Sequence, residues 1–227
     1  MNTEINALEK TKSVDTYFKY KTIAYHGIKR TFDICCALAG LLILLPAIVV
    51  IKIATMLSGD FHSIFYSQIR YGKDGKEFKF YKFRSMLVDS EDLLTKTLEM
   101  DPVAAEEYKT TKKLKNDPRI TKIGKFIRKT SVDELPQIIN ILKGDMSVVG
   151  NRPYLPRERE DIGEYFDDIM KTKPGLTGLW QVSGRSDTTF EERLELEKKY
   201  SNIAGLKIDT KIFIKTFAAV LLSKGAE

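Results

Sequence analysis

The sequence predicts an α+β fold that is mainly α-helical, with a small β-hairpin, an N-terminal helix–break–helix entering a membrane, and amphipathic helices at the membrane surface. Residues 34–51 contain no charge, residues 61–86 alternate around a glycine-containing turn, and most other segments have helical composition. At 227 residues, the chain is long enough for one sizeable domain with appendages. We therefore expect an N-terminal lead-in over residues 1–27, a re-entrant membrane hairpin over 28–58 and a cytosol-facing domain over 59–227.

The charge balance indicates an anionic partner. The net charge of +6 suits nucleic acid, a phosphorylated substrate or acidic lipid, and charge alone does not choose among them. The two cysteines, Cys35 and Cys36, are adjacent, so they form neither a disulfide framework nor a spaced metal motif, and they favour a reducing compartment. Two histidines without a Cys/His cluster argue against a zinc site.

The uncharged run at residues 34–51, "ICCALAGLLILLPAIVVI", is short for a spanning helix, which needs ~20 residues. Pro46 removes one backbone donor and its ring clashes with the preceding turn, so we expect the helix to bend or break there. Both flanks are basic: residues 19–30 hold four bases and no acid, and residues 52–84 hold seven bases and three acids. Because basic flanks favour the cytoplasmic side, the sequence favours a re-entrant hairpin. A kinked spanning helix and a buried helix of a soluble core are the alternatives.

Strand and helix patterns follow the membrane segment in order. The alternating, aromatic-rich "FKFYKF" (78–83) and the turn "GKDG" (72–75) predict the β-hairpin. Residues 89–115 have helical composition, and Asp101 and Pro102 predict a boundary between two helical pieces.

Short helices are expected over the remaining chain. Gly144 suits a left-handed C-cap, and Thr188 with Glu191 suits a capping box. The helix expected over residues 206–222 carries three lysines four residues apart. It could lie on an anionic membrane surface or pack as an ordinary helix with one solvent-exposed face. The expected helices cover residues 120–129, 136–142, 156–171, 188–200 and 206–222.

Two adjacent carboxylates, Asp133 and Glu134, stand just before Pro136. The string "SVDE" matches a capping box, but with Ser131 as N-cap the proline would fall where a backbone hydrogen bond is needed. A helix that begins at Leu135 or Pro136 is easier, because proline is tolerated in the first turn. The two carboxylates then lie at the entrance of the helix.

The surroundings of this pair favour its ionised form. The positive end of the helix dipole and the preceding bases Arg128 and Lys129 both stabilise negative charge there. An ionised carboxylate beside bases suits a nucleophile, a metal ligand or a salt-bridge partner. Sequence spacing by itself leaves these three roles open.

Several strings together resemble one family. In order along the chain they are "KRTFDI", an apolar run with a central proline, "QIRYGKDGKEFKFYKFRSM", "DPRITKIGKFIRKTSVDELPQIINILKGDMSVVGNRP" and "KPGLTGLWQVSGRSD". They resemble the bacterial sugar transferases, and more specifically the monotopic polyprenyl-phosphate phosphoglycosyl transferases in their catalytic-core form. The resemblance covers about residues 28–222. A departure is Asn151, where the family commonly has the first proline of a Pro-Arg-Pro element.

The resemblance implies a reaction. A phosphoglycosyl transferase moves sugar-1-phosphate from a UDP-sugar to undecaprenyl phosphate and releases UMP, at the first membrane step of exopolysaccharide, capsule or O-antigen synthesis. Asp133 would be the nucleophile that forms a phosphosugar intermediate, and Glu134 would assist it. Mg²⁺ is expected as cofactor, with Asp133 as its ligand, and the "GLWQVSGRSD" string is similar to that of enzymes that use galactose or glucose.

The resemblance also assigns substrate-binding residues. Arg128 and Arg152 match family arginines and would contact phosphate, for which a planar guanidinium is well shaped. Lys82 and Arg84 are candidates for the same anionic pocket, with structural salt bridges as the alternative. Arg185, in the loop that also holds the single tryptophan, could contact a donor phosphate, with a purely structural loop as the alternative.

Partners and location follow from this assignment. We expect a UDP-sugar donor, an undecaprenyl phosphate acceptor and membrane lipids, no nucleic acid, a possible homo-oligomer, and a bacterial inner-membrane location with the catalytic domain facing the cytoplasm. The rival hypothesis is a non-catalytic basic peripheral membrane protein that binds anionic lipid or nucleic acid. Against it, residues 112–129 carry eight bases and one acid directly before the carboxylate pair.

Overall fold

The N-terminal helix α1 runs without interruption from Asn2 to Leu57. The computed structural model describes residues 2–111, 114–184 and 188–221. Within them, Thr22–Leu57 is the one helix long and apolar enough to cross a membrane, and only 17% of its most apolar window is buried. Such low burial argues against the core helix of a soluble domain.

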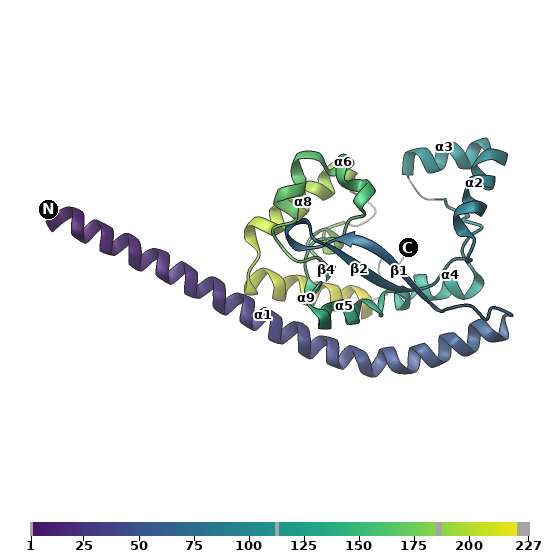
Figure 1. Ribbon diagram of the computed structural model, residues 1–227, viewed down its shortest axis with the longest axis horizontal. Coiled ribbons are helices and arrows are strands. Elements are labelled where there is room, and N and C mark those ends of the chain that lie inside the picture. The colour runs from purple at the N-terminus through teal and green to yellow at the C-terminus, as the bar shows by residue number, and fades with distance from the viewer. Residues whose placement is uncertain (1, 112–113, 185–187, 222–227) are drawn as a thin grey trace.

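Pro46 lies inside α1, and the backbone stays helical through it. Figure 1 shows α1 descending from the N-terminus along the lower side of the molecule and rising again over its last part. The expected break is therefore a bend, because a proline removes one hydrogen bond and tilts the helix without ending it. The expected lead-in and membrane hairpin are parts of this single bent helix, and their placement in a membrane stays a prediction.

The predicted β-hairpin is confirmed. Strands β1 (Phe65–Tyr71) and β2 (Glu77–Phe83) pair antiparallel, and Asp74 and Gly75 adopt positive φ in the turn between them. Arg70 is opposite Phe78 in this register, and side chains of opposed residues share a face. One face of the hairpin therefore carries Tyr66, Gln68, Arg70, Phe78, Phe80 and Lys82.

Helices α2 (Ser90–Met100) and α3 (Pro102–Thr111) confirm the two helical pieces expected around Asp101. The Asp101 carboxylate accepts backbone hydrogen bonds from the first turn of α3, as an N-cap does. Helix α4 (Lys122–Lys129) follows, capped by the Thr121 hydroxyl. In Figure 1, α2 and α3 lie at the opposite side of the molecule from α6 and α8.

Helix α5 (Gln137–Lys143) begins after Pro136 and ends at Gly144, whose φ of 88° is the left-handed C-cap expected from the sequence. A second pair of strands, β3 (Ser147–Val149) and β4 (Gly175–Thr177), is parallel and was not expected. Gly150 packs so closely against this pair that a Cβ there would lie 2.2 Å from the Lys173 carbonyl oxygen. Glycine is required at that crossing because no side chain fits.

The segment 156–171 is not the single surface helix that was expected. Gly163, with φ of 55°, interrupts it, and apolar residues on both sides are buried in a small core. The pieces are η3 (Pro156–Glu158), α6 (Arg159–Ile162), η4 (Gly163–Tyr165) and α7 (Phe166–Ile169).

Two long helices, α8 (Phe190–Ile203) and α9 (Leu206–Leu221), complete the described chain. The capping box of α8 is formed by Thr189 and Glu192, so the expectation of Thr188 and Glu191 was wrong by one residue. The physical reason is that the Thr188 hydroxyl accepts a hydrogen bond from the indole of Trp180 instead.

Polar contacts fix α1 to the rest of the molecule. Lys29 reaches the buried Asp209 of α9 at 2.5 Å, and Arg30 donates to two carbonyls at the C-terminal end of α5. Asp33, 3% exposed, accepts hydrogen bonds from the side chain of Ser147 and the backbone of Val148. The helix is therefore anchored by a buried polar seam as well as by apolar packing.

The main core lies between α1, α5, β2, β3, α8 and α9. Its buried members are Ala37, Phe80, Ile138, Ile141, Met146, Val148, Val149, Tyr200 and Ile212. A second cluster joins α1 to the hairpin and α4 through Leu44, Ile51, Ile64, Phe83 and Ile127. Both clusters hold the hairpin and the start of α5 in one rigid arrangement.

Candidate active site

The carboxylate pair lies in a short 3₁₀ turn, Val132–Glu134, between α4 and α5. Ser131 adopts a left-handed conformation with φ of 56° and makes no side-chain capping bond. The capping-box alternative is therefore wrong. Asp133 and Glu134 stand at the entrance of α5, as the sequence predicts.

The pair faces Lys82 of β2. The Lys82 ammonium lies 2.8 Å from a carboxylate oxygen of Glu134 and 3.5 Å from one of Asp133. The Asp133 side chain is 10% exposed and that of Glu134 is 40% exposed. Asp133 is thus a shielded carboxylate, whereas Glu134 reaches solvent.

A buried amide holds the pair against the hairpin. Asn140 of α5, fully buried, accepts a hydrogen bond from the backbone N–H of Tyr81 and donates one to the carbonyl of Lys79. Both contacts are in β2, next to Lys82. The register between the start of α5 and the hairpin is therefore set by hydrogen bonds, and with it the meeting of Lys82 and the two acids.

Burial raises the pKa of Asp133 above its ordinary value, and the neighbouring Glu134 raises it further. Lys82 and Arg128 oppose this shift, Lys82 more strongly. The sequence-based expectation of a carboxylate kept ionised by a helix dipole and by arginines understated the desolvation cost of burial. Lys82 is the group that most favours the charged form.

Arg128 lies at the end of α4, is exposed, and acts on Asp133 through its charge. Among the described residues its guanidinium makes no hydrogen bond or ion pair, so its donors are available to an anion near the pair. Its position agrees with the phosphate-binding role that the family resemblance implies.

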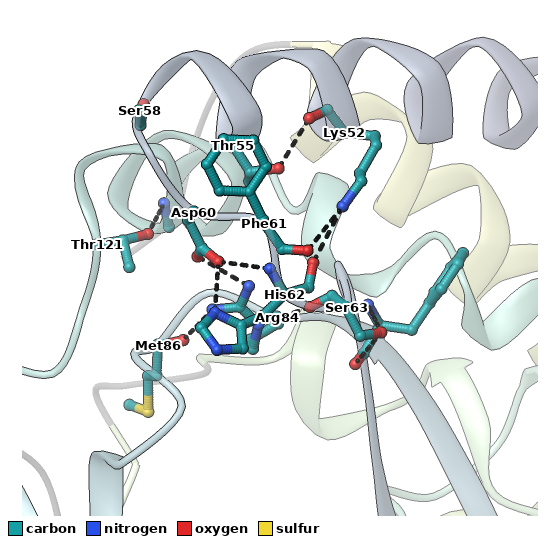
Figure 2. Close-up of polar contacts among 12 residues, drawn as sticks. Lys52, Thr55, Ser58, Asp60, Phe61, His62, Ser63, Arg84, Met86 and Thr121 are labelled. Atoms are coloured by element: carbon teal, nitrogen blue, oxygen red, sulfur yellow. Dashed lines mark hydrogen bonds and ion pairs between the residues drawn. The ribbon is translucent and has the colours of Figure 1, made fainter.

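Arg84 does not join this site. Its three guanidinium nitrogens donate to the carbonyl of Ser63 at 2.7 Å, the carbonyl of Met86 at 3.2 Å and the carboxylate of Asp60 at 2.8 Å. Figure 2 shows Arg84 and His62 converging on Asp60 where α1 passes into the hairpin. Arg84 is therefore a structural residue of this junction, which is the alternative left open for it.

Arg152 lies in the segment after β3, among charged side chains from three elements. Its guanidinium is 3.7 Å from Glu158, and its backbone N–H donates to Glu197 of α8 at 3.4 Å. Burial and the nearby Arg193 lower the pKa of Arg152. Arg70 approaches the same Glu158 at 3.8 Å and donates to the carbonyl of Pro153.

One aromatic ring connects the two groups of charges. The Arg70 guanidinium carbon and the Lys82 ammonium lie 5.3 and 5.6 Å from the centroid of Phe80. The pair at residues 133–134 and the arginines near Glu158 thus belong to one continuous row along the hairpin face.

Two residues of the loop that follows β4, Arg185 and Trp180, remain to be placed. Arg185 lies outside the described residues. The Trp180 ring is contacted by the guanidinium of Arg193 at 4.7 Å, and its N–H is occupied by Thr188.

The donor set fits a magnesium ion that is shared with substrate. Among the described residues there is no cluster of three or more His, Cys, Asp and Glu side chains that could hold a metal ion. Mg²⁺ is commonly bound by one or two carboxylates together with substrate phosphates, and Asp133 and Glu134 supply that number. A magnesium site here would need the donor diphosphate to complete it.

Comparison with known protein families decides the class. The family model described as "Bacterial sugar transferase" matches residues 24–223, most of the chain. The chain belongs to the bacterial sugar transferase family.

This sugar transferase is similar to several curated proteins. It is 47% identical over 199 residues to the "UDP-galactose-lipid carrier transferase" of Erwinia amylovora, covering 88% of this chain and 41% of the relative. It is 45% identical to the "Undecaprenyl-phosphate galactose phosphotransferase" of Salmonella typhimurium, with the same coverage. The "Exopolysaccharide production protein ExoY" of Sinorhizobium fredii is 40% identical, with 87% of each chain covered. The transferase thus spans about two fifths of the first two relatives and most of the third.

Sequence reasoning missed Arg70, Arg193 and Glu197 of this transferase. Arg70 could have been found from the turn at 72–75, because the hairpin register puts it on the face of Lys82. Arg193 and Glu197 are four residues apart on α8, a spacing typical of an exposed helix pair. Only their burial, at 9% and 1% exposure, distinguishes them from ordinary surface charges.

Proposed function

We propose that this sugar transferase moves a hexose-1-phosphate from a UDP-sugar to undecaprenyl phosphate and releases UMP. The observation that carries the proposal is a shielded Asp133 beside Glu134, held between Lys82 of the hairpin and Arg128 of α4. A nucleophilic carboxylate among cations is what an attack on a diphosphate requires. The names of two relatives, which act on galactose and a lipid carrier or undecaprenyl phosphate, agree with it.

The first chemical step uses Asp133 as nucleophile. Its carboxylate oxygen attacks the sugar-bearing phosphorus of the UDP-sugar, and the bond from that phosphorus to the bridging oxygen breaks. UMP leaves with the electron pair, and the sugar phosphate stays on Asp133. Lys82 and Arg128 would stabilise the negative charge that accumulates on the phosphoryl oxygens.

The second step returns the enzyme to its starting state. An oxygen of undecaprenyl phosphate attacks the same phosphorus, and the bond to Asp133 breaks to regenerate the carboxylate. Two successive displacements let one site serve a soluble donor and then a lipid acceptor, with ping-pong kinetics as the signature. We assign Glu134 to assist Asp133, because it shares Lys82 and is the more exposed of the two acids.

Mg²⁺ would be held by Asp133, Glu134 and the donor diphosphate. Bound there, it would neutralise charge on the diphosphate and help the leaving group depart. Removal of divalent metal with a chelator is therefore expected to abolish UMP release.

The enzyme class can be tested directly. Detergent-solubilised protein is incubated with a UDP-sugar, Mg²⁺ and undecaprenyl phosphate, and UMP is measured. Because the relatives' names specify galactose, UDP-galactose is expected to be the best donor, with UDP-glucose as the comparison. Absence of UMP with every common UDP-hexose would favour the rival, a non-catalytic protein that binds anionic lipid.

The membrane arrangement needs its own test. We propose that α1 enters the inner membrane from the cytoplasm and returns, because both of its flanks are basic and it bends at an internal proline. Single cysteines replace Tyr20 and Ser58 in a chain that lacks Cys35 and Cys36, and an impermeant thiol reagent is applied from each side. Labelling of both from the cytoplasmic side is expected, whereas labelling from opposite sides would make α1 a spanning helix.

A further inference from the structure

Glu197 is a fully buried acid that the reaction above does not use. Its side chain is 1% exposed on α8. One carboxylate oxygen accepts the backbone N–H of Arg152 at 3.4 Å and lies 3.6 Å from the guanidinium of Arg193. The other oxygen is buried and makes no well-formed hydrogen bond among the described residues, and the nearby Tyr154 hydroxyl also acts on this carboxylate. A buried carboxylate that is only partly satisfied is costly to maintain.

Arg152, whose backbone Glu197 contacts, has guanidinium donors that lack acceptors among the described residues. Its side chain is 34% exposed, and its one ion pair within the described part of the chain, to Glu158, is 3.7 Å long. Its buried Nε has no partner in the described part of the chain. A guanidinium with unused donors at the edge of a charged cluster is suited to a bidentate anion such as phosphate.

The position of Arg152 relative to the carboxylate pair suits a donor that extends along the hairpin. Arg70 shares Glu158 with Arg152 and shares the Phe80 ring with Lys82. Attack by Asp133 at the sugar-bearing phosphorus leaves the second phosphate and the nucleoside to extend away from that residue. The row Lys82, Arg70 and Arg152 gives this part of the donor a positively charged path.

We propose that Glu197 is a positioning residue for donor binding, which holds the backbone of Arg152 in place and takes up a proton when the donor diphosphate binds beside that arginine. The inference rests on the proposed function and adds to it a proton linkage at a buried site. Glu197 acts through Arg152 and does not touch the donor.

The electrostatics give the linkage its sign. Burial raises the pKa of Glu197 to about 7, against the opposing effects of Arg193, Tyr154 and Arg152. Among the described residues, the charged or titratable side chains that act on it most are these three, and Glu158 contacts the guanidinium of Arg152. A diphosphate adds negative charge nearby and raises the pKa of Glu197 further, so binding draws in a proton. Donor affinity is therefore expected to increase as the pH falls through 7.

The experiment is calorimetric titration of UDP-galactose into the full chain carrying Asp133→Asn, with Mg²⁺, at pH 7 in two buffers of different ionisation enthalpy. The D133N background removes turnover and the titration of Asp133. The donor is a diphosphate diester with no group that titrates near pH 7, so any exchanged proton comes from the protein. The difference between the two buffers measures proton uptake. We expect a substantial fraction of one proton.

Three variants in that background complete the test. Glu197→Gln should bind UDP-galactose without proton uptake and with a dissociation constant that does not change between pH 6 and 8. Glu197→Asp should restore the pH dependence. Glu195 is an exposed acid on the same helix, and Glu195→Gln should behave like the D133N chain that carries no second substitution. Thermal melting checks that each variant is folded.

The outcomes separate the two hypotheses. Absence of UDP-galactose binding both to the folded D133N chain and to the chain with native Asp133 would contradict the proposed function itself. Binding to the parent without proton uptake would overturn the role of Glu197 alone, and needs no variant. Equal uptake in the parent and in Glu197→Gln would also overturn it, because another group would then supply the linkage.

Discussion

Two clusters of charged residues in this transferase have opposite roles. One contains Arg84 and Asp60, and the other contains Arg152, Glu158 and Glu197. At the junction of α1 and the hairpin, every guanidinium nitrogen of Arg84 has an acceptor within 3.2 Å. Near α8, Arg152 makes one ion pair at 3.7 Å, and its Nε has no partner among the described residues. The satisfied arginine stabilises a turn, whereas the unsatisfied one is available to a ligand.

The same contrast separates two neighbours on one strand. Lys82 and Arg84 are two residues apart on β2 and its extension, and point to the same side by strand alternation. Lys82 reaches the acids before α5, while Arg84 turns back to the end of α1. Lys82 and Arg84 are both basic and lie close together in the sequence. The acceptors that surround each side chain therefore determine that Arg84 stabilises the fold and that Lys82 belongs to the candidate site.

The largest expected effect comes from Asp133→Asn, which leaves both clusters intact and removes the nucleophile. Turnover should fall by about 10³-fold or more, because no covalent intermediate can form. Intact-mass measurement after incubation with UDP-galactose should show a phosphosugar adduct on the parent and none on this variant. An adduct on the variant would show that another residue is the nucleophile.

Lys82→Met should have the next largest effect, since it removes the cation shared by both acids. We expect a loss of roughly 100-fold in kcat. Loss of Lys82 also raises the pKa of Asp133, which burial already raises, so the acid limb of the pH–rate profile should move to higher pH. A profile that keeps its acid limb in place would mean that Lys82 does not control the ionisation of Asp133.

Paired alanine variants of the two arginines test the central contrast. Arg152→Ala should raise KM for the UDP-sugar by about tenfold to a hundredfold, the value of charged hydrogen bonds to phosphate, without lowering the melting temperature. Arg84→Ala should instead destabilise the fold by ~1–3 kcal/mol, because it leaves acceptors at the junction unpaired. Equal effects of both substitutions on KM would remove the distinction between the clusters.

His62→Ala should have the smallest effect, and it tests how much of the junction between α1 and the hairpin depends on this side chain. The His62 side chain is 69% exposed and contacts Asp60 at 3.1 Å, an interaction that solvent screens. We expect a stability change within about 0.5 kcal/mol and no change in KM. Denaturant unfolding and the UMP assay measure the two quantities, and a large loss of stability would show that Arg84 depends on His62.

Local sequence patterns predicted the fold where they were strong. The aromatic alternation around "GKDG", the proline in the apolar run, Asp101–Pro102 and Gly144 each marked a real turn, bend or helix end. Patterns failed where long-range packing decided the outcome. The segment 156–171 became four short pieces because its apolar residues enter a core, and the α8 box shifted because Trp180 occupies Thr188.

The candidate site divides in the same way. From the sequence alone, the adjacent acids, their place before a helix and the basic segment ahead of them were already determined, because these depend on neighbours in the chain. Which distant cations meet those acids, and how deeply Asp133 and Glu197 are buried, was decided only by the packing of β2 and α8 against segments far away in sequence. Desolvation depends on all the atoms that surround a group in the folded protein, and the local sequence pattern does not specify those atoms.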